Sequence, residues 1–205
     1  MLAEKALTRA TEVSDAVYDL SREIARSVVL VRGSRGSAGS GVIWDRPGLV
    51  ITNHHVVPGS AAYLTLSDGR RLAANVVGRA PAVDLAALSV PDADLHNLAA
   101  RVGDSDRLRV GDLLVAVGNP MGERSAPSLG ILASAPDDVL RLAITLRPGN
   151  SGGALANARG EVVGIPHMVT GSGLALAVAT RTVRHFLDGT TGEEGEVDSS
   201  HLRWI

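Results

Sequence analysis

Cysteine is absent from this sequence, which excludes disulfide bonds, thiolate nucleophiles and cysteine-ligated zinc sites. Aromatic residues are almost as scarce, with two Trp, two Tyr and one Phe among 205 residues. A core must therefore be aliphatic, and stacking platforms for bases or sugars are few. Lys5 is the only lysine, so a serine–lysine dyad would have to use a residue at the start of the chain.

Strong net charge and long apolar runs are also missing. The formal net charge is −2, which gives no reason to expect nucleic acid as a partner. No run approaches the roughly 18 apolar residues of a membrane-spanning helix, and acidic residues interrupt residues 1–27, where a signal peptide would lie. We expect no membrane segment and a cytoplasmic location for the chain as written. A periplasmic or other extracytoplasmic location is expected instead if a targeting segment has been removed.

The first 26 residues predict an amphipathic helix. Their apolar positions recur at alternating spacings of three and four, which places one apolar stripe on a helical face. The stripe comprises Ala3, Ala6, Ala10, Val13, Val17, Leu20 and Ile24. Two interpretations stay open, in which the stripe packs on the protein's own barrel or docks on a partner subunit.

After this helix the helical spacing of apolar residues stops. Two groups of six short β-branched or aliphatic runs follow. Gly, Pro, Asp and Asn separate the runs. The pattern predicts an all-β fold of two six-stranded antiparallel β-barrels. The expected strands are 27–32, 41–44, 49–52, 61–66, 72–77 and 85–90, then 113–118, 129–133, 139–146, 153–156, 161–165 and 174–179.

These runs divide the chain into five parts. The N-terminal helix at 1–26 precedes a first barrel at 27–98, a connector at 99–112 and a second barrel at 113–188. The second barrel ends in a short C-terminal helix, for which Thr180 is the expected N-cap. Residues 189–205 are polar and acidic, so we expect a flexible tail.

The chemistry begins at the turn Gly149-Asn150-Ser151-Gly152-Gly153. Glycines on both sides of a serine allow a tight turn with an exposed hydroxyl, and they leave neighbouring backbone N–H groups free to face a reacting oxygen. Acyl transfer by a serine needs both features. The turn by itself is weak evidence, because many loops contain similar runs.

A base and an orienting carboxylate are found in the first predicted barrel. His54 and His55 come at the end of one strand, and Asp84 directly precedes another. An imidazole with a buried carboxylate is what a weakly nucleophilic hydroxyl requires. Adjacent strand residues point to opposite faces, so the two histidines are not expected to share a metal ion. We expect neither a metal nor a cofactor.

Several motifs in order along residues 27–187 resemble the HtrA/Deg serine proteases of the chymotrypsin-like superfamily. The resemblance implies His55 as general base, Asp84 as its orienting partner and Ser151 as nucleophile. It implies an oxyanion hole at Gly149, Asn150 and Ser151, formed by the N–H groups of the first and last. The motifs are TNHHVV at 52–57, DLAAL at 84–88, VGDSD at 102–106, VGNPMG at 117–122 and PGNSGGAL at 148–155.

The same resemblance suggests where substrate binds. The segment after GEVVGI pairs with an extended substrate backbone in this superfamily, which favours unfolded or extended polypeptide. No acidic residue lies among the expected pocket residues, so we expect a small aliphatic side chain at P1, the residue before the cleaved bond. The expected substrate-binding residues are Thr145, Leu146, His167, Met168 and Val169. His167 either competes for Asp84 or serves as a wall residue.

The sequence departs from the family pattern in four places. We expect no PDZ domain after the protease domain, and the turn at 135–138 is short where the family has an activation-sensor loop. Ala143 and Arg147 replace an expected aspartate and asparagine near Ser151. Three functions therefore stay open, namely an active endopeptidase, a silent peptide-binding module and a chaperone-like trimer assembled through the N-terminal segment.

Overall fold

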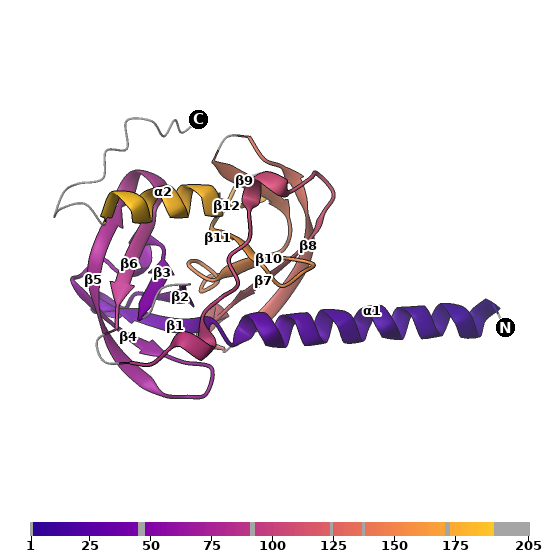
Figure 1. Cartoon of the computed structure of the whole chain (residues 1–205), viewed down its shortest axis with the longest axis horizontal. Helices are drawn as coiled ribbons and strands as arrows, with labels where there is room; N and C mark the ends of the chain where they lie inside the picture. The colour runs from indigo at the N-terminus through magenta and orange to yellow at the C-terminus, as the bar shows by residue number, and fades with distance from the viewer. Residues whose placement is uncertain are drawn as a thin grey trace.

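The computed structural model describes residues 2–44, 48–90, 93–123, 125–136, 138–170 and 173–190, without the side chains of residues 2–6, Arg35, Met168 and Thr190. Two closed six-stranded antiparallel barrels lie side by side, with a helix at each end of the chain (Figure 1). This confirms the predicted fold class. The flexible tail expected at 189–205 lies outside the described residues from residue 191 onward.

The first barrel closes in the strand order β1-β2-β3-β6-β5-β4. Each of its strands overlaps one of the predicted runs, although β5 extends farther, to Ala80, and brings its end close to the turn before Asp84. The strands are β1 (Val28–Gly33), β2 (Ala38–Ile43), β3 (Leu49–Thr52), β4 (Ala61–Thr65), β5 (Arg71–Ala80) and β6 (Leu85–Ser89).

The second barrel closes in the order β10-β11-β12-β9-β8-β7. The strand β9 ends at Ala143, three residues before the predicted end, because its neighbour β12 begins at Ala175, which pairs with Leu142, and offers no partner farther along. The strand β11 runs past its predicted end to Val169 through a register shift against β12. The strands are β7 (Leu113–Gly118), β8 (Ala126–Ser134), β9 (Val139–Ala143), β10 (Ala154–Asn157), β11 (Val162–Val169) and β12 (Ala175–Ala179).

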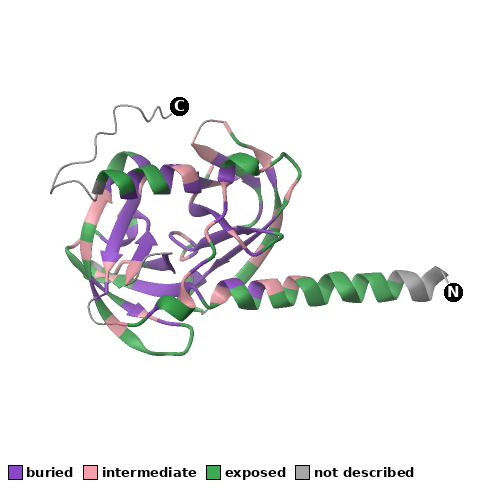
Figure 2. Ribbon diagram, in the orientation of Figure 1, coloured by how far each residue is buried: buried purple, intermediate pink, exposed green. Residues whose placement is uncertain are grey.

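The buried side chains form an aliphatic cluster inside each barrel and a third cluster between them (Figure 2). The third cluster joins Val42 and Ile51 of the first barrel to Val117 and Ile165 of the second. Burial of this apolar interface holds the barrels together at about 25 cal/mol per Å² of apolar surface. Residues at the barrel interface are thereby held in fixed relative positions.

The N-terminal helix α1 (Leu2–Ala25) projects away from the barrels (Figure 1). Only its last turns pack on the protein, where Ser21 and Ile24 are buried. Leu7 and Val13 are 70% and 62% exposed. The interpretation that the stripe packs on the protein's own barrel thus holds only for the C-terminal end of the helix. None of the described helices combines the length and apolarity that a membrane crossing requires.

The C-terminal helix α2 (Thr180–Thr190) packs Val183, Phe186 and Leu187 against the interface between the barrels. Thr180 was expected to cap this helix. Its hydroxyl instead donates to the carbonyl of Gly103 at 3.1 Å and accepts from the N–H of Ser105 at 3.2 Å. The start of α2 is therefore bonded to the connector between the barrels.

Candidate active site

Asp84 follows the short 3₁₀ turn η3 (Pro81–Val83) and has a left-handed backbone with φ of 53°. This conformation is unfavourable for a residue other than glycine and persists where surrounding contacts impose it. The carbonyl of Asp84 accepts from Nδ2 of Asn53 at 2.8 Å and from the N–H of His54 at 3.1 Å. Asn53 is fully buried, and its place at the end of an apolar strand is the sequence signal that could have identified it.

The carboxylate of Asp84 binds His55 twice. Its Oδ1 accepts from the backbone N–H of His55 at 3.0 Å, and its Oδ2 lies 2.7 Å from Nδ1 of the imidazole. The bond to a carboxylate fixes the ring tautomer and leaves Nε2 as the basic nitrogen. The ring belongs to the 3₁₀ turn η2 (His54–Val56), and its side chain is 51% exposed.

The electrostatics of this pair favour an ionised carboxylate and a basic imidazole. Burial raises the pKa of Asp84, but the close approach of His167 and the hydrogen bonds from His55 outweigh burial and hold that pKa below its usual range. The hydrogen bond to Asp84 raises the pKa of His55, against a smaller opposing effect of desolvation. His55 is therefore a stronger base than a free histidine.

His54 belongs to a different set of contacts. Its Nδ1 accepts from the guanidinium of Arg79 at 3.0 Å, and Arg79 also donates to the carbonyl of Gly59. Burial and the charge of Arg79 lower the pKa of His54. Both histidines lie in a 3₁₀ turn instead of the predicted strand end. In the described part of the chain no group of three or more His, Asp or Glu is placed to hold a metal ion.

The glycines around Ser151 are required by close backbone contacts. Gly149 has φ of 100°, and a Cβ there would lie 2.6 Å from the carbonyl oxygen of Asn119. Gly152 has φ of 82°, and a Cβ there would overlap the carbonyl oxygen of Ser40. Only glycine meets both demands at these positions. The turn is thereby pressed against both barrels.

Three peptide units of the turn differ in how their polar groups are used. The carbonyl of Pro148 accepts from the N–H of Met121 at 3.1 Å, so the N–H of Gly149 in the same trans peptide points the opposite way. The N–H groups of Gly149 and Ser151 have no acceptor among the described residues. The N–H of Asn150 donates to Arg147 at 3.0 Å. The N–H of Asn150 is therefore used within the turn, and Asn150 takes part in the expected oxyanion hole only as the residue between the two donors.

The Ser151 hydroxyl contacts His167. Its Oγ donates to the carbonyl of His167 at 3.4 Å, and within the described ranges it makes no hydrogen bond to His55. The ring of His167 is 6% exposed, and its Nδ1 lies 3.6 Å from Oδ2 of Asp84. His167 therefore lies between Asp84 of the first barrel and Ser151 of the second. It is a neighbour of Asp84 and also part of the cleft wall, so both alternatives describe it.

A cleft of about 380 Å³ opens beside Ser151. Three of the expected substrate-binding residues line it, namely Leu146, His167 and Val169, while Thr145 is exposed and does not. The side chain of Met168 lies outside the described residues. Arg147, Pro148 and Asn150 complete the lining with Ser151. The described wall is mainly apolar and includes no acidic side chain.

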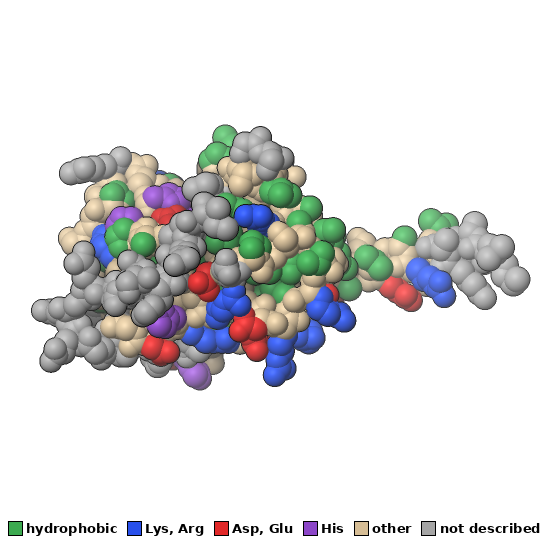
Figure 3. Space-filling view, turned by 90° about the horizontal axis from the view of Figure 1, so that it is seen from above, with side chains coloured by type: hydrophobic (Ala, Val, Ile, Leu, Met, Phe, Trp, Pro, Cys, Tyr) green, Lys and Arg blue, Asp and Glu red, His purple; other side chains and the backbone are tan. Residues whose placement is uncertain are grey.

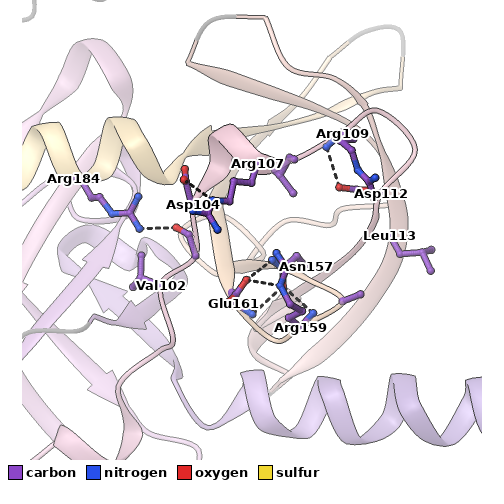
Figure 4. A pocket seen from close by; sticks show the side chains of 13 residues that line it. Val102, Asp104, Arg107, Arg109, Asp112, Leu113, Asn157, Arg159, Glu161 and Arg184 are labelled. Atoms are coloured by element: carbon purple, nitrogen blue, oxygen red, sulfur yellow. Dashed lines mark hydrogen bonds and ion pairs between the residues drawn. The ribbon is translucent and has the colours of Figure 1, made fainter.

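A second cleft, of about 740 Å³, lies between the connector, the β10–β11 turn and α2 (Figure 4). Three of its arginines are paired with acidic groups of the same cleft, and the described lining includes no serine or histidine. Arg159 and Asn157 bind Glu161, Arg109 binds Asp112, and Arg184 donates to the carbonyl of Gly103. The Arg184 contact joins α2 to the connector, whereas the other contacts lie within the connector or within the β10–β11 turn. The described lining offers no nucleophile.

Sequence comparison places this site among known proteins. Residues 39–165 match the trypsin-like peptidase domain. The chain belongs to this family. The matched range includes His55, Asp84 and Ser151 and most of both barrels.

The chain also resembles individual members of known function. It is 35% identical over 181 residues to the periplasmic serine endoprotease DegP of Salmonella typhimurium, covering 80% of this chain and 38% of that protein. It is 38% identical over 148 residues to the serine protease Do-like HtrA of Lactobacillus helveticus, covering 64% and 36%. The chain thus spans well under half the length of these relatives.

Among solved structures, the chain is similar to the HtrA-type protease AlgW in complex with a decapeptide. The two superpose with a TM-score of 0.76 and 28% sequence identity, covering 87% of this chain and 68% of the other.

Proposed function

We propose that this chain is a serine endopeptidase in which Ser151 attacks the peptide carbonyl, His55 acts as general base and Asp84 orients His55. The observation that carries the proposal is the pair of bonds from Asp84 to His55, at 3.0 and 2.7 Å, across from a glycine-flanked serine. The membership of the chain in the trypsin-like peptidase family supports it.

The reaction would proceed through an acyl-enzyme. Ser151 Oγ forms a bond to the scissile carbonyl carbon while its proton passes to Nε2 of His55, and the negative charge develops on the carbonyl oxygen. The N–H groups of Gly149 and Ser151 would stabilise that oxygen. The imidazolium returns the proton to the leaving amine, and water then hydrolyses the ester by the same path.

For this step the Ser151 hydroxyl has to leave the carbonyl of His167 and turn toward His55. The 3.4 Å contact to that carbonyl is long for a hydroxyl donor, so little free energy opposes the rotation. Catalytic hydrogen bonds are often absent before substrate binds. The proposed reaction therefore needs only a rotation of the Ser151 side chain before attack.

Extended polypeptide is the substrate class that fits the cleft. The ladder between β11 and β10 ends at Gly164, and the β11 segment 167–169 continues along the cleft with its other edge on β12. A substrate strand can add to that edge by β-augmentation. The apolar cleft walls of Leu146, Pro148 and Val169 favour a small aliphatic P1 side chain.

The test of this proposal is labelling with a fluorophosphonate, which reacts only with an activated serine. The native chain should be labelled at Ser151, and Ser151→Ala and His55→Ala should not react. A peptide library should show cleavage after Val, Ala or Leu, and cleavage after Lys or Arg would contradict the P1 assignment. Native protein that is folded but unlabelled would contradict the protease function.

A peptide-binding or chaperone-like module without catalysis is the second candidate. One observation favours it, namely that the Ser151 hydroxyl contacts the His167 carbonyl instead of His55. This candidate predicts that native protein and Ser151→Ala bind an unfolded polypeptide equally and that neither cleaves it. Cleavage by the native protein alone would exclude it.

We further propose that the chain forms a homotrimer through α1. Most of that helix is exposed, and an apolar surface lies on the second barrel on the side where the helix leaves it (Figure 3). Exposed side chains there include Val110, Leu113, Leu129 and Ile131, and Leu113 is paired with Ile131 across β7 and β8. Light scattering should give a trimer, and deletion of residues 2–16 should give a folded monomer.

An extracytoplasmic location is favoured over a cytoplasmic one. The name of the Salmonella relative places that protein in the periplasm, and the absence of cysteine makes folding of this chain independent of the redox compartment. Cell fractionation of the producing organism would decide between the two locations.

A further inference from the structure

Ser40 is a polar residue in the apolar interface between the two barrels. It belongs to β2 of the first barrel, lies between Gly39 and Gly41, and is fully buried. A hydroxyl in such a place destabilises the fold unless hydrogen bonds satisfy it. Its hydrogen-bond partners therefore indicate why a polar residue is tolerated in the interface.

Every hydrogen-bonding capacity of the Ser40 hydroxyl is used on the second barrel. Oγ donates to the carbonyl of Gly149 at 2.7 Å, and it accepts from the backbone N–H of Asn119 at 2.8 Å and from its Nδ2 at 3.2 Å. One donor and two acceptor positions complete the set for a serine hydroxyl. Asn119 is 2% exposed and is itself held by the carbonyl of Val29 at 2.9 Å.

The backbone of Ser40 binds the same turn a second time. Its N–H donates to the carbonyl of Ser151 at 2.8 Å, and its own carbonyl accepts from Oγ1 of Thr52 at 2.6 Å. Ser40 thus binds the carbonyls of both residues whose N–H groups form the proposed oxyanion hole. Thr52 is fully buried and supports Ser40 from the next strand, β3.

We propose that the Ser40 hydroxyl is a positioning group for the oxyanion hole, an inference that rests on the proposed function. The Pro148 carbonyl is bound to Met121 on one side of Gly149, and the Gly149 carbonyl is bound to Ser40 on the other. These two bonds orient the peptide planes on either side of Gly149. Without the hydroxyl, the flexible glycine can rotate its N–H away from the cleft.

The experiment compares Ser40→Ala with the native chain. We expect fluorophosphonate labelling of Ser151 to slow by about 10- to 100-fold. Removing an oxyanion donor altogether slows catalysis by roughly 10²- to 10³-fold. The effect here should be smaller, because the donor is displaced and not deleted. In peptide cleavage kcat should fall with KM unchanged. A peptide boronate needs the oxyanion hole, so it should bind Ser40→Ala correspondingly more weakly than the native chain. An unmodified peptide should bind the double variant Ser40→Ala/Ser151→Ala with the same affinity as the single variant Ser151→Ala.

The matched control is Ser27→Ala. Ser27 is also buried, and its hydroxyl also donates to a backbone carbonyl, that of Ile24 at 2.8 Å, but it lies between α1 and β1 and does not contact the turn. This variant should have the labelling rate of the native chain. Labelling of folded Ser40→Ala at the native rate would overturn the proposal.

Two further outcomes are distinguished in advance. If Ser40→Ala does not fold, Ser40→Cys takes its place with the same readouts. The S–H group is a weak donor, and its longer C–S bond cannot reproduce the 2.7 Å contact to the Gly149 carbonyl. Labelling should therefore still slow, and native-rate labelling of Ser40→Cys overturns the proposal. Failure of the native chain to be labelled contradicts the proposed function itself. Failure of the positioning role is instead seen as native labelling that Ser40 substitutions leave unchanged.

Discussion

The imidazoles of His167 and His55 both lie against Oδ2 of Asp84. Nδ1 of His167 is 3.6 Å from this oxygen, and Nδ1 of His55 is 2.7 Å from it. Two histidines from different barrels therefore share one carboxylate oxygen. The same His167 also offers its carbonyl to the Ser151 hydroxyl at 3.4 Å. His167 of β11 thus contacts Asp84 of the first barrel and Ser151 of the second.

Substitution of His167 by Asn should lower kcat by about 10-fold, on the order expected when a polar contact to a charged group is weakened. Because the carboxylate then acts on His55 alone, the pKa of His55 should rise and the acid limb of kcat/KM should move to higher pH. The measurement is a pH–rate profile. His185→Asn, on the exposed face of α2, is the control. An unmoved acid limb in His167→Asn would contradict the shared carboxylate.

Substitution of Asp84 by Asn should lower kcat by about 10⁴-fold, as expected when the orienting carboxylate of a serine-protease triad becomes an amide. The pKa of His55 is raised chiefly by its hydrogen bond to Asp84, and the reaction needs the neutral imidazole. Native kcat/KM should therefore rise with pH through this elevated pKa, and the residual activity of Asp84→Asn should rise at lower pH. Coincident profiles for the two proteins would show that another base titrates.

Substitution of Gly149 by Ala should abolish labelling and destabilise the fold by about 1–3 kcal/mol, because a left-handed backbone becomes strained and the new Cβ meets the Asn119 carbonyl oxygen at 2.6 Å. Gly111→Ala is a matched control, since Gly111 has φ of 92° but open space around its Cβ position. The control should lose stability and retain the native labelling rate. Equal labelling of both variants would show that the turn geometry does not matter for reactivity.

The Asp84–His55 pair should stabilise the fold within a limited pH window. A carboxyl with a lowered pKa stabilises the folded state above its unfolded pKa, and this contribution is lost as pH falls. An imidazole with a raised pKa stabilises below its unfolded pKa, and this contribution is lost as pH rises. The difference in urea stability between native protein and Asp84→Asn should therefore be largest between about pH 4 and 6.5.

Urea titrations at stepped pH provide that comparison. Asp15→Asn, on the exposed part of α1, removes the same charge without touching the pair and should track the native protein at every pH. A stability difference for Asp84→Asn that stays constant from pH 3 to pH 8 would mean that the pair does not couple to folding.

Local sequence patterns determined the elements of this fold. Short β-branched runs bounded by Gly, Pro and Asp predicted all twelve strands because a strand buried on one or both faces needs just those residues. Strand ends were predicted less well, as at β9 and β11, because a strand stops where its neighbour stops offering hydrogen bonds. The same local reading placed His55, Asp84 and Ser151 in recognisable motifs.

The contacts that prepare the site came only from the tertiary structure. Ser40 and Gly149 are 109 residues apart in sequence, and His55 and Asp84 are 29 apart. Nothing in the run around Ser40 shows which carbonyl its hydroxyl will meet, and the residues around His167 left open whether its ring faces Asp84. Side-chain pairing of this kind depends on how two closed barrels pack across a shared apolar interface, and that packing is a property of the whole chain.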